Sequence, residues 1–397
     1  MAIQKTDTKR AWLAWGATIA VALILLWIGH AATRPAGGVF GGGEGVITRR
    51  AQVLRILESQ FEAFEYAGED NSANLGTTTI VFEAKILQGK ARGETVSATQ
   101  TVDGSSAFQQ RAIQLGDKIL LSAEEPDLEA FFFEDYSRSG PLYLLLLFFC
   151  ALIILFGRKT GVNTVLSLAF TVAAVFLVLL PAVLGGQNIY LWSVLTCVYV
   201  TAVTMPLISG YGKKTLAATV GCIGGVLAAG LFMLLMTHAL KLSGLVDEDS
   251  LYLGMLKPED PIDLRAVLFA MVIVGAVGAV MDVAMSIASA LYELKEKAPT
   301  LTRRELFNSG LRIGRDMMGT MANTLVLAYI GSSMTCVLLQ MTYSANAAHM
   351  LGKETVISEL LQGLVGSIGM VLALPLTSAV SAVLFAESAP TADKEKI

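Results

Sequence analysis

The chain has 397 residues, a formal net charge of −4 at pH 7, and a composition of 54% hydrophobic and only 16% charged residues. Average soluble domains contain about 25% charged residues, so this composition excludes a soluble protein of two or three domains, although the length alone would allow one. The hydrophobic residues are concentrated in long runs, which are typical of membrane-spanning helices.

Eight stretches are long and apolar enough to cross a bilayer, which requires about 20 residues of helix because lipid offers no partner to a backbone amide. They cover residues 11–30, 141–157, 162–184, 188–209, 215–240, 264–292, 319–341 and 357–386. Pro181, Pro206 and Pro375 fall inside three of them, where a proline either kinks a static bundle or provides a hinge. The sequence therefore predicts an α-helical polytopic membrane protein of about eight transmembrane helices.

The stretch at 11–30 follows Lys9 and Arg10 and precedes Ala31 and Ala32, as a cleaved signal peptide would. Its apolar run of about 19 residues is longer than the usual signal core of about 7 to 15, so we favour an uncleaved anchor helix. Lys and Arg gather in every second loop between the stretches, at 158–159, 213–214 and 295–315. By the positive-inside rule, we expect these loops and both termini in the cytoplasm.

Residues 31–139 separate the first two stretches and are expected outside the cytoplasm. They begin with a Gly-rich linker at 31–46 that contains the run RPAGGVFGGGEG, a composition typical of flexible chain. The segment at 47–139 follows, and its runs TTTIVFEAKIL, ETVSATQTV, DKILLS and EAFFFEDY are typical of strands separated by turns. VITRRAQVLRIL is a fifth candidate strand that could equally be a helix. The pattern predicts a small extracytoplasmic β-rich domain, either a barrel or a sandwich.

The rest of the chain divides into a seven-helix membrane bundle at 140–386 and a cytoplasmic tail at 387–397, while 1–30 form the N-terminal tail and anchor helix. Within the bundle, Thr302 and Glu305 have the spacing of a capping box. The residues that follow, 306–313, are expected to form a basic amphipathic helix on the inner membrane surface. Close helix packing is expected at the glycines of two stretches, Gly221, Gly224, Gly225, Gly363, Gly366 and Gly369.

The sequence contains no motif for catalysis, nucleotide binding or metal binding. GYGKKT at 210–215 lacks the Ser or Thr that must follow the Gly-Lys pair of a phosphate loop. His30, His238 and His349 form no pair with the spacing of metal ligands. We therefore expect no enzyme activity, no cofactor, no metal and no nucleic-acid partner, and we interpret the outer domain as a structural or partner-binding cap.

One acidic residue, Asp282, lies deep in an apolar stretch, about one helical turn from the midpoint between Arg265 and Glu293. A carboxylate at that depth costs about 2.5 to 3.5 kcal/mol on insertion scales, so it must face protein or water. At 100° per residue it shares one stripe of the helix with Gly275, Gly278, Ser286, Ser289 and Glu293. The glycines allow another helix to approach, which predicts a packed polar seam.

Two interpretations of this seam stay open. Intramembrane acids are functional by default, so the stripe around Asp282 could carry protons or ions. Alternatively, the carboxyl group could hold the bundle together by bonding to Asn323, Thr324 or Ser378 on neighbouring helices. The first interpretation predicts a transporter and the second a membrane scaffold.

Several runs resemble one family. DLRAVLFAMVIVGAVGAVMDVAMSIASALYEL at 263–294 and TRRELFNSGLRIGRDMMGTMANTLVLAYIGSS at 302–333 resemble the bacterial YibE/F family of multipass membrane proteins. GRKTG at 157–161 and, in the outer domain, AKILQGKARGE and GDKILLS are also similar to that family. The resemblance implies a multipass protein of the bacterial cytoplasmic membrane, and it implies no particular activity.

A second likeness is weaker. An anchor helix, an outer domain and a bundle are also the layout of one half of a resistance-nodulation-division exporter or SecD/SecF protein, where a helix similar to GAVGAVMDVAMSIASALYELKEK carries an acid after small residues. By this likeness Asp282 would carry protons. The sequence departs from that pattern because it has eight predicted helices where such a half has six, and because no deep Lys or Arg can pair with the acid.

These observations predict an ion- or proton-coupled transporter or export component of unknown substrate. The alternative is a non-transporting scaffold or accessory subunit with a partner-binding outer domain, and a membrane-embedded enzyme is disfavoured. The expected partners are the lipid bilayer and either a second membrane protein or further copies of the chain. The sequence indicates neither the substrate nor the direction of movement.

Overall fold

The computed structural model describes residues 2–34, 46–63, 76–89, 91–103, 111–124, 130–257 and 260–386. Most of the predicted linker at 31–46 and the whole tail at 387–397 lie outside these residues. The chain divides into two compact units, Phe40–Leu152 and the remainder, Met1–Val39 with Ile153–Ile397. The first unit contains all the described strands, and the second contains most of the helices.

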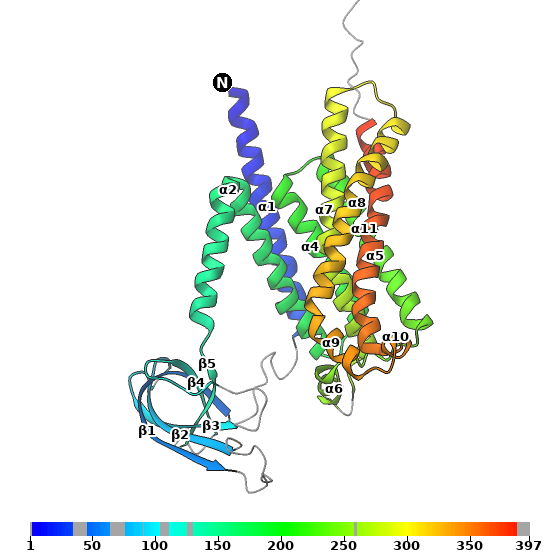
Figure 1. The fold of residues 1–397 in the computed structure, drawn as a ribbon. Coiled ribbons are helices and arrows are strands. Elements are labelled where there is room, and N and C mark those ends of the chain that lie inside the picture. Colours follow the sequence, from blue (N-terminus) through cyan, green and yellow to red (C-terminus); the bar gives the residue numbers. More distant parts are fainter. Residues whose placement is uncertain are drawn as a thin grey trace, which may run out of the picture. The chain divides into compact units, whose positions relative to one another are not determined.

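Five strands close into a barrel in the order β1-β2-β3-β5-β4 (Figure 1). Their bounds are β1 (Val46–Ala63), β2 (Gly76–Ile86), β3 (Thr95–Asp103), β4 (Lys118–Glu124) and β5 (Phe131–Tyr136). The pairs are antiparallel except for β3 with β5, which is parallel. The predicted β domain is thereby confirmed as a barrel, and the run that begins at Val46 is a strand.

Closure of the barrel depends on the long first strand. β1 pairs with β4 through its first half and with β2 through its second half, and its register shifts between Val53 and Arg55 and between Ile56 and Glu58. Such bulges bend a strand and increase its twist, which allows one strand to belong to both sides of a small barrel. Alternate residues of β2, including Phe82, then point into the barrel and are buried.

The helices follow in the order α1 to α11. Their bounds are α1 (Ala2–Thr33), α2 (Ser139–Ala174), the π-helical segment η1 (Val175–Leu179), α3 (Leu180–Leu184), α4 (Ile189–Ser209), α5 (Lys213–Ala239), α6 (Glu248–Met255), α7 (Leu264–Lys297), α8 (Arg303–Ser332), α9 (Met334–Tyr343), α10 (Ala347–Leu351) and α11 (Glu354–Ala386). Six helical segments of the described chain are long and apolar enough to cross a membrane, or up to seven if α8 and α9, bent by 64°, form one span. The protein is therefore a multipass helical membrane protein.

The longest of these segments, Ser139–Leu184, contains two of the predicted stretches. They meet at Arg158, whose φ of 49° and ψ of −122° lie outside the helical range. Gly161 makes this junction possible, because a side chain there would collide with the backbone carbonyl of Ile153. The sequence separates the same two stretches at 158–161, so the break in the helix falls where the prediction has a loop.

Pro181 follows the π-helical segment and has no N–H to donate to the carbonyl group of Leu177. Nδ1 of His30, at the end of α1, lies 2.9 Å from that carbonyl oxygen. Gly29, beside His30, also packs closely against Val178. The first helix therefore supports the irregular turn that the proline requires.

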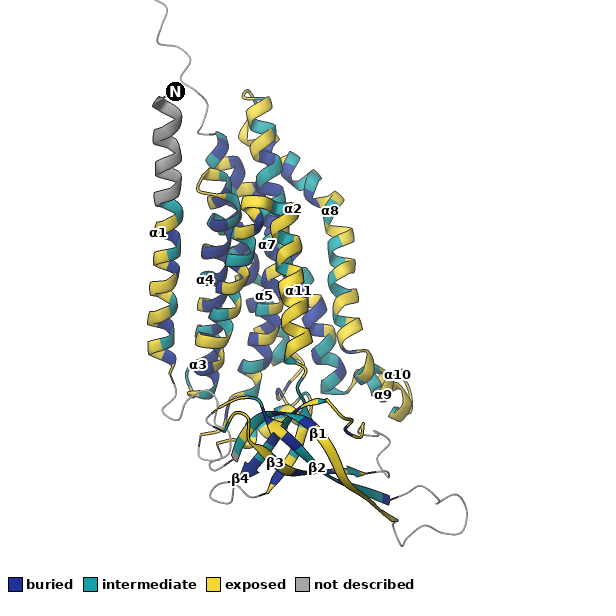
Figure 2. Cartoon of the chain, turned by 90° about the vertical axis from the view of Figure 1, so that its left-hand side faces the viewer, coloured by how far each residue is buried: buried dark blue, intermediate teal, exposed yellow. Residues whose placement is uncertain are grey.

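The core of the bundle lies where α5, α7 and α11 pack against one another, and α4 and α8 pack around them. Figure 2 shows buried residues gathered between α4, α5 and α7, whereas much of α1 and α8 is exposed. A Cβ atom on Gly225 would lie 2.8 Å from Val280 of α7 and 2.9 Å from the carbonyl oxygen of Gly369. A Cβ atom on Gly369 would lie 2.7 Å from Ala229. The prediction of close helix packing at these glycines is confirmed.

The segment after Thr302 corrects one expectation. The capping box is present, since Thr302 N–H donates to Glu305 at 2.8 Å and Glu305 N–H donates to the Thr302 hydroxyl at 3.3 Å. However, α8 continues from Arg303 to Ser332 as one helix that packs on α7 and α11. Leu306, Gly310 and Gly314 are buried against this bundle. The structure therefore has no separate amphipathic helix among the described residues 302–313, because their apolar side is covered by protein.

Candidate functional site

The helix that carries Asp282 is fixed at its start by Asp263. The side chain of Asp263 accepts hydrogen bonds from the backbone N–H groups of Arg265 at 3.0 Å and Ala266 at 3.3 Å, which caps α7. Asp282 then lies about 27 Å from Leu264 and about 22 Å from Lys297 along the helix axis. Because a bilayer core is about 30 Å thick, the predicted position near mid-depth follows from α7 itself.

One side of α7 is buried and the other is open. Val272, Ala276 and Val280 are among the residues that pack into the bundle core. On the opposite side, four residues are exposed and form what we call the open face of α7: Met271, Gly275, Gly278 and Asp282. Ser286 and Ser289 continue this face toward the inner end and are half-buried. The structure thus brings the five predicted site residues together on one face.

The expectation of a packed seam is wrong for Gly278 and Asp282 within the described chain, whereas the Tyr329 hydroxyl of α8 lies against Gly275. Gly275, Gly278 and Asp282 are exposed, and a Cβ atom on Gly278 would meet nothing within 4 Å. Helical periodicity places residues on a common face, but it does not determine whether another helix covers that face. Here the described neighbouring helices leave Gly278 and Asp282 uncovered, while Tyr329 of α8 reaches Gly275.

The three predicted partners of Asp282 are engaged elsewhere or lie exposed. The Ser378 hydroxyl is buried and donates to the carbonyl oxygen of Leu374 at 2.8 Å. The Thr324 hydroxyl donates to Thr320 in the same way, at 2.8 Å. Asn323 is exposed on α8. Among the described residues, no hydrogen bond or ion pair joins the Asp282 carboxyl group to any side chain.

The open face of α7 borders a groove of about 340 Å³. We call it the α4–α7 groove, and its lining residues come from α2, η1, α4 and α7: Thr171, Val175, Thr196, Cys197, Val200, Thr204, Val274, Gly275, Val277, Gly278 and Met281. Among these lining residues, Met281 immediately precedes Asp282 and Gly278 lies one helical turn before it. The carboxyl group is therefore close to the groove.

Two hydroxyl groups in the groove lack partners. Thr196 and Thr204 are 4% and 7% exposed, and their hydroxyls have no hydrogen-bond partner among the described residues. In contrast, Thr201 on the same helix donates to the carbonyl oxygen of Cys197 at 2.8 Å. A buried polar group without a partner costs about 1 to 3 kcal/mol. The groove therefore retains polar groups that a ligand or water could bind.

Sequence reasoning missed a second acid on the same side of the bundle. Glu359 lies in the second turn of α11 and is half-buried. One turn later, a Cβ atom on Gly363 would lie 3.7 Å from the ring of Tyr329, and the Tyr329 hydroxyl reaches Gly275 on the open face. The signal was available, because ELLQGL places an acid in the apolar run at 357–386.

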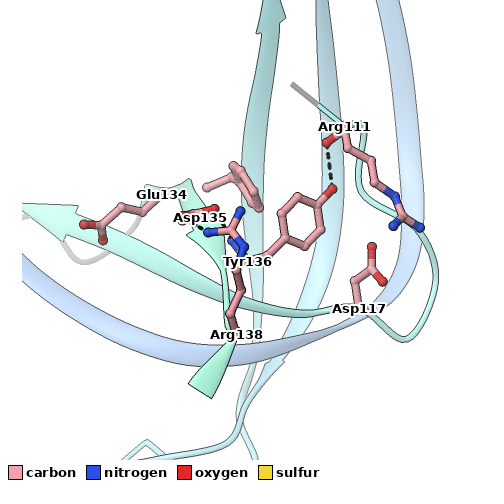
Figure 3. Close-up of a pocket in the computed structure, with 7 residues that line it drawn as sticks. Arg111, Asp117, Glu134, Asp135, Tyr136 and Arg138 are labelled. Carbon is pink, nitrogen blue, oxygen red and sulfur yellow. Dashed lines mark hydrogen bonds and ion pairs between the residues drawn. The ribbon is translucent and has the colours of Figure 1, made fainter. Parts of the chain in front are cut away.

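The barrel has its own cavity, of about 650 Å³, where β5 leads into α2. We call it the barrel–helix pocket, and it is lined by Arg111, Asp117, Phe133, Glu134, Asp135, Tyr136 and Arg138. In Figure 3, Arg111 and Asp117 lie on one side of the Tyr136 ring, Asp135 and Arg138 lie on the other, and Glu134 points away. Sequence analysis predicted no site in this domain, because these residues come from separate segments without a motif.

Hydrogen bonds fix the walls of the barrel–helix pocket. The Tyr136 hydroxyl donates to the carbonyl oxygen of Arg111 at 2.6 Å, and Arg138 pairs with Asp135 at 2.6 Å. The hydrogen bond from Arg138 lowers the pKa of Asp135, and burial raises the pKa of Tyr136. Asp135 is therefore ionised and Tyr136 neutral at pH 7. No group of three or more His, Cys, Asp or Glu residues in the described chain could hold a metal ion.

Comparison with known proteins identifies the family. A family model described as YibE/F-like protein matches residues 145–387, which include α4, α5, α7, α8 and α11. No curated protein and no solved structure matches the chain. The likeness to resistance-nodulation-division and SecD/SecF proteins stays a prediction. Because the match covers more than half of the sequence, this multipass membrane protein belongs to the YibE/F-like family.

Proposed function

We propose that the protein is an ion- or proton-coupled transporter or export component, in which Asp282 takes up and releases the coupling proton. The observation that carries this proposal is the exposed carboxyl group near mid-depth of α7, which has no partner among the described residues. A carboxylate facing lipid at that depth is unfavourable by about 2.5 to 3.5 kcal/mol. A water-lined path would remove this penalty, and a path is what a transporter requires.

The proposed topology has eight membrane spans, both termini in the cytoplasm and the barrel outside a bacterial cytoplasmic membrane. The non-helical residue Arg158 supports the division of Ser139–Leu184 into two spans. Taking α8 with α9 as one span then gives eight. The distribution of Lys and Arg among the loops supports the orientation.

The α4–α7 groove is the proposed path beside Asp282. Its unpartnered hydroxyls, Thr196 and Thr204, can bind water or a polar substrate group in place of the missing protein partners. One irregular helix segment borders this region, since Val175 of the π-helical segment lines the groove. Elsewhere in the bundle, α8 is bent by 64° from α9. Broken helices are common at substrate sites of transporters, and π-helical segments are frequent at functional sites.

Protonation of Asp282 would change whether water or another helix is the more favourable neighbour of the open face of α7. The ionised group requires water or a cation, whereas the neutral acid tolerates an approaching helix. Gly275 and Gly278 allow that approach because they present no side chain. Proton binding would thereby shift the equilibrium between an open and a covered groove. We propose no enzymatic step, no cofactor and no nucleic-acid partner in this cycle.

A second candidate is a scaffold, in which another membrane protein or a second copy covers the open face permanently. The same exposure of Gly275, Gly278 and Asp282 favours this alternative, since glycine faces also join helices of different chains. In that case the carboxyl group would bond to the partner, and the protein would move nothing.

The test compares Asp282→Asn with Glu293→Gln, a matched loss of charge three turns later on the same helix. Each purified variant is reconstituted into liposomes that contain a pH-sensitive dye. Proton flux into the liposomes and the yield of folded protein are then measured. A further readout is labelling by dicyclohexylcarbodiimide, which attacks protonated carboxyl groups at membrane depth. If the protein is a transporter, we expect proton flux in Asp282→Asn to be at least about tenfold lower than in the wild type, which corresponds to about 1.4 kcal/mol. The folded yield of this variant should be normal. Labelling of Asp282 in the wild type should depend on pH.

The remaining outcomes count against the proposal. Loss of folded yield in Asp282→Asn, with unchanged flux in the fraction that folds, identifies the scaffold. Wild-type flux and wild-type yield together would show that Asp282 is neither a relay nor a support. Glu293→Gln should match the wild type throughout, because its side chain is exposed near the end of α7.

A further inference from the structure

Two cations and three anions line the barrel–helix pocket. Arg111 and Asp117 belong to the segment before β4, and Asp135 and Arg138 belong to β5 and the residues after it. The fifth charged residue, Glu134, is turned away from the cavity toward Thr48, whose hydroxyl donates to it at 3.2 Å. The four other charged residues, two cations and two anions, therefore balance.

The backbone of this pocket is held independently of any ligand. Gln100, 1% exposed inside the barrel, donates to the Arg111 carbonyl oxygen at 3.1 Å and accepts from the Ile113 N–H at 2.9 Å. The Gln114 N–H donates to Asp117 at 2.8 Å. Because a buried amide fixes the loop, Arg111 starts from a defined position at the rim.

The start of α2 places Arg138, one wall of the pocket, at the depth of lipid headgroups when α2 spans a bilayer. The N–H of Leu142 donates to the Arg138 carbonyl oxygen, so α2 begins directly after Arg138. Residues 142–149 are all large, hydrophobic and exposed, as expected for a helix entering hydrocarbon. Four residues of helix span about 6 Å, and the polar layer on each side of a bilayer is about 5 to 7 Å thick. Arg138 is therefore within that layer.

The charged residues of the barrel–helix pocket favour one kind of phospholipid headgroup over others. Guanidinium groups bind phosphate through paired hydrogen bonds, and carboxylates accept hydrogen bonds from a primary ammonium group. A purely anionic headgroup would satisfy Arg111 and Arg138 but meet Asp117 and Asp135 unfavourably. A quaternary ammonium group has no N–H to donate to them. A phosphate joined to a primary amine satisfies both kinds of residue.

The existing ion pair does not prevent binding. Arg138 and Asp135 have side chains that are 70% and 48% exposed, and such surface pairs contribute only about 0 to 1 kcal/mol. Arg111 bonds through its guanidinium to the neutral Gln114 at 3.0 Å. Both arginines can therefore exchange or share these contacts with a phosphate group at little cost.

We infer that the barrel–helix pocket binds a phosphoethanolamine group, with the phosphate on Arg111 and Arg138 and the amine on Asp117 and Asp135. At this depth the natural source is the headgroup of a zwitterionic phospholipid, and a soluble phosphoethanolamine compound is the other source of the same chemistry. Lipid binding here would hold the barrel at the membrane surface. The inference requires α2 to enter the membrane, but it does not depend on transport.

The test uses the full chain, purified in detergent and stripped of lipid. Retention of phosphatidylethanolamine, phosphatidylcholine and phosphatidylglycerol is measured by native mass spectrometry at equal concentrations. We expect phosphatidylethanolamine to be retained at least about tenfold better than the other two, a difference of about 1.4 kcal/mol. The double variant Arg111→Gln/Arg138→Gln should lose this preference. Arg55→Gln is the matched control, because Arg55 pairs with Glu83 on the same barrel at 2.7 Å and lies outside the pocket.

A competition arm distinguishes the two sources. Glycerophosphoethanolamine, which lacks acyl chains, should displace the lipid only at much higher concentration if the lipid is the ligand. Displacement at equal concentration assigns the pocket to a soluble compound. Equal retention of the three lipids by the wild type, or an unchanged preference in the folded double variant, overturns the inference. Folding of that variant is checked by hydrogen exchange of the barrel strands.

Discussion

The barrel and the bundle differ in how completely their buried polar groups are satisfied. In the barrel, the buried Gln100 uses both ends of its amide, and the exposed charged pairs Arg55–Glu83 and Arg138–Asp135 are also formed. In the described part of the bundle, the buried hydroxyls of Thr196 and Thr204 have no partners. A satisfied polar network favours one rigid structure, whereas unsatisfied groups mark places where something else binds. The comparison indicates a rigid barrel and a bundle that retains groups able to bind something else.

The largest effect is expected from Gln100→Leu in the barrel. This change removes the acceptor of the Ile113 N–H, which is buried, so the barrel should lose about 1 to 3 kcal/mol of stability. Faster hydrogen exchange at residues 111–124 of the full chain would report the loss. Gln52→Leu is the control, because its exposed amide bonds only to Gly116, and exposed changes usually stay within about 0.5 kcal/mol. Equal effects of the two changes would refute the rigid-barrel interpretation.

A smaller effect, of opposite sign, is expected in the groove. Thr196→Val and Thr204→Val remove hydroxyls without partners, so the free energy of unfolding should stay unchanged or rise by up to about 1 kcal/mol. Thr201→Val removes a hydroxyl that bonds to Cys197 and should lower it by about 0.5 to 1.5 kcal/mol. Thermal unfolding of the three variants in one detergent measures these changes in stability. If Thr196 and Thr204 variants are as destabilised as Thr201→Val, their hydroxyls have partners and the groove is not a binding site.

The smallest expected effect is on the stability of the barrel at low pH. The pKa of Asp135 is lowered in the folded barrel because Arg138 donates to it, so this pair contributes stability above the unfolded pKa of about 3.9. That contribution disappears as the pH falls through the folded pKa, and it is small because the pair is exposed. The fraction of β5 that opens, measured as hydrogen exchange relative to the intrinsic amide exchange rate at each pH, should rise less steeply between pH 5 and 2.5 in Arg138→Gln than in the wild type. The same slope in both would show that the ion pair does not form in solution.

Local patterns in the sequence were sufficient for the membrane helices, the capping box at Thr302 and the glycine contacts of α5 with α11. Each of these depends on composition or on residues a few positions apart. The five site residues of α7 also share one face, as periodicity predicts. Glu359 and Tyr329 were missed because their relation to Gly275 joins three helices that are distant in sequence.

The sequence by itself determined that this chain enters the membrane and carries an acid near mid-depth, because hydrophobic length and helical spacing are local properties. Only the tertiary structure decided that the five strands close into a barrel, since closure depends on bulges in β1 and on pairing across the domain. It also decided that Asp282 lies uncovered rather than in a packed seam. A helix's own residues define its faces, but the positions of its neighbours determine which face they cover.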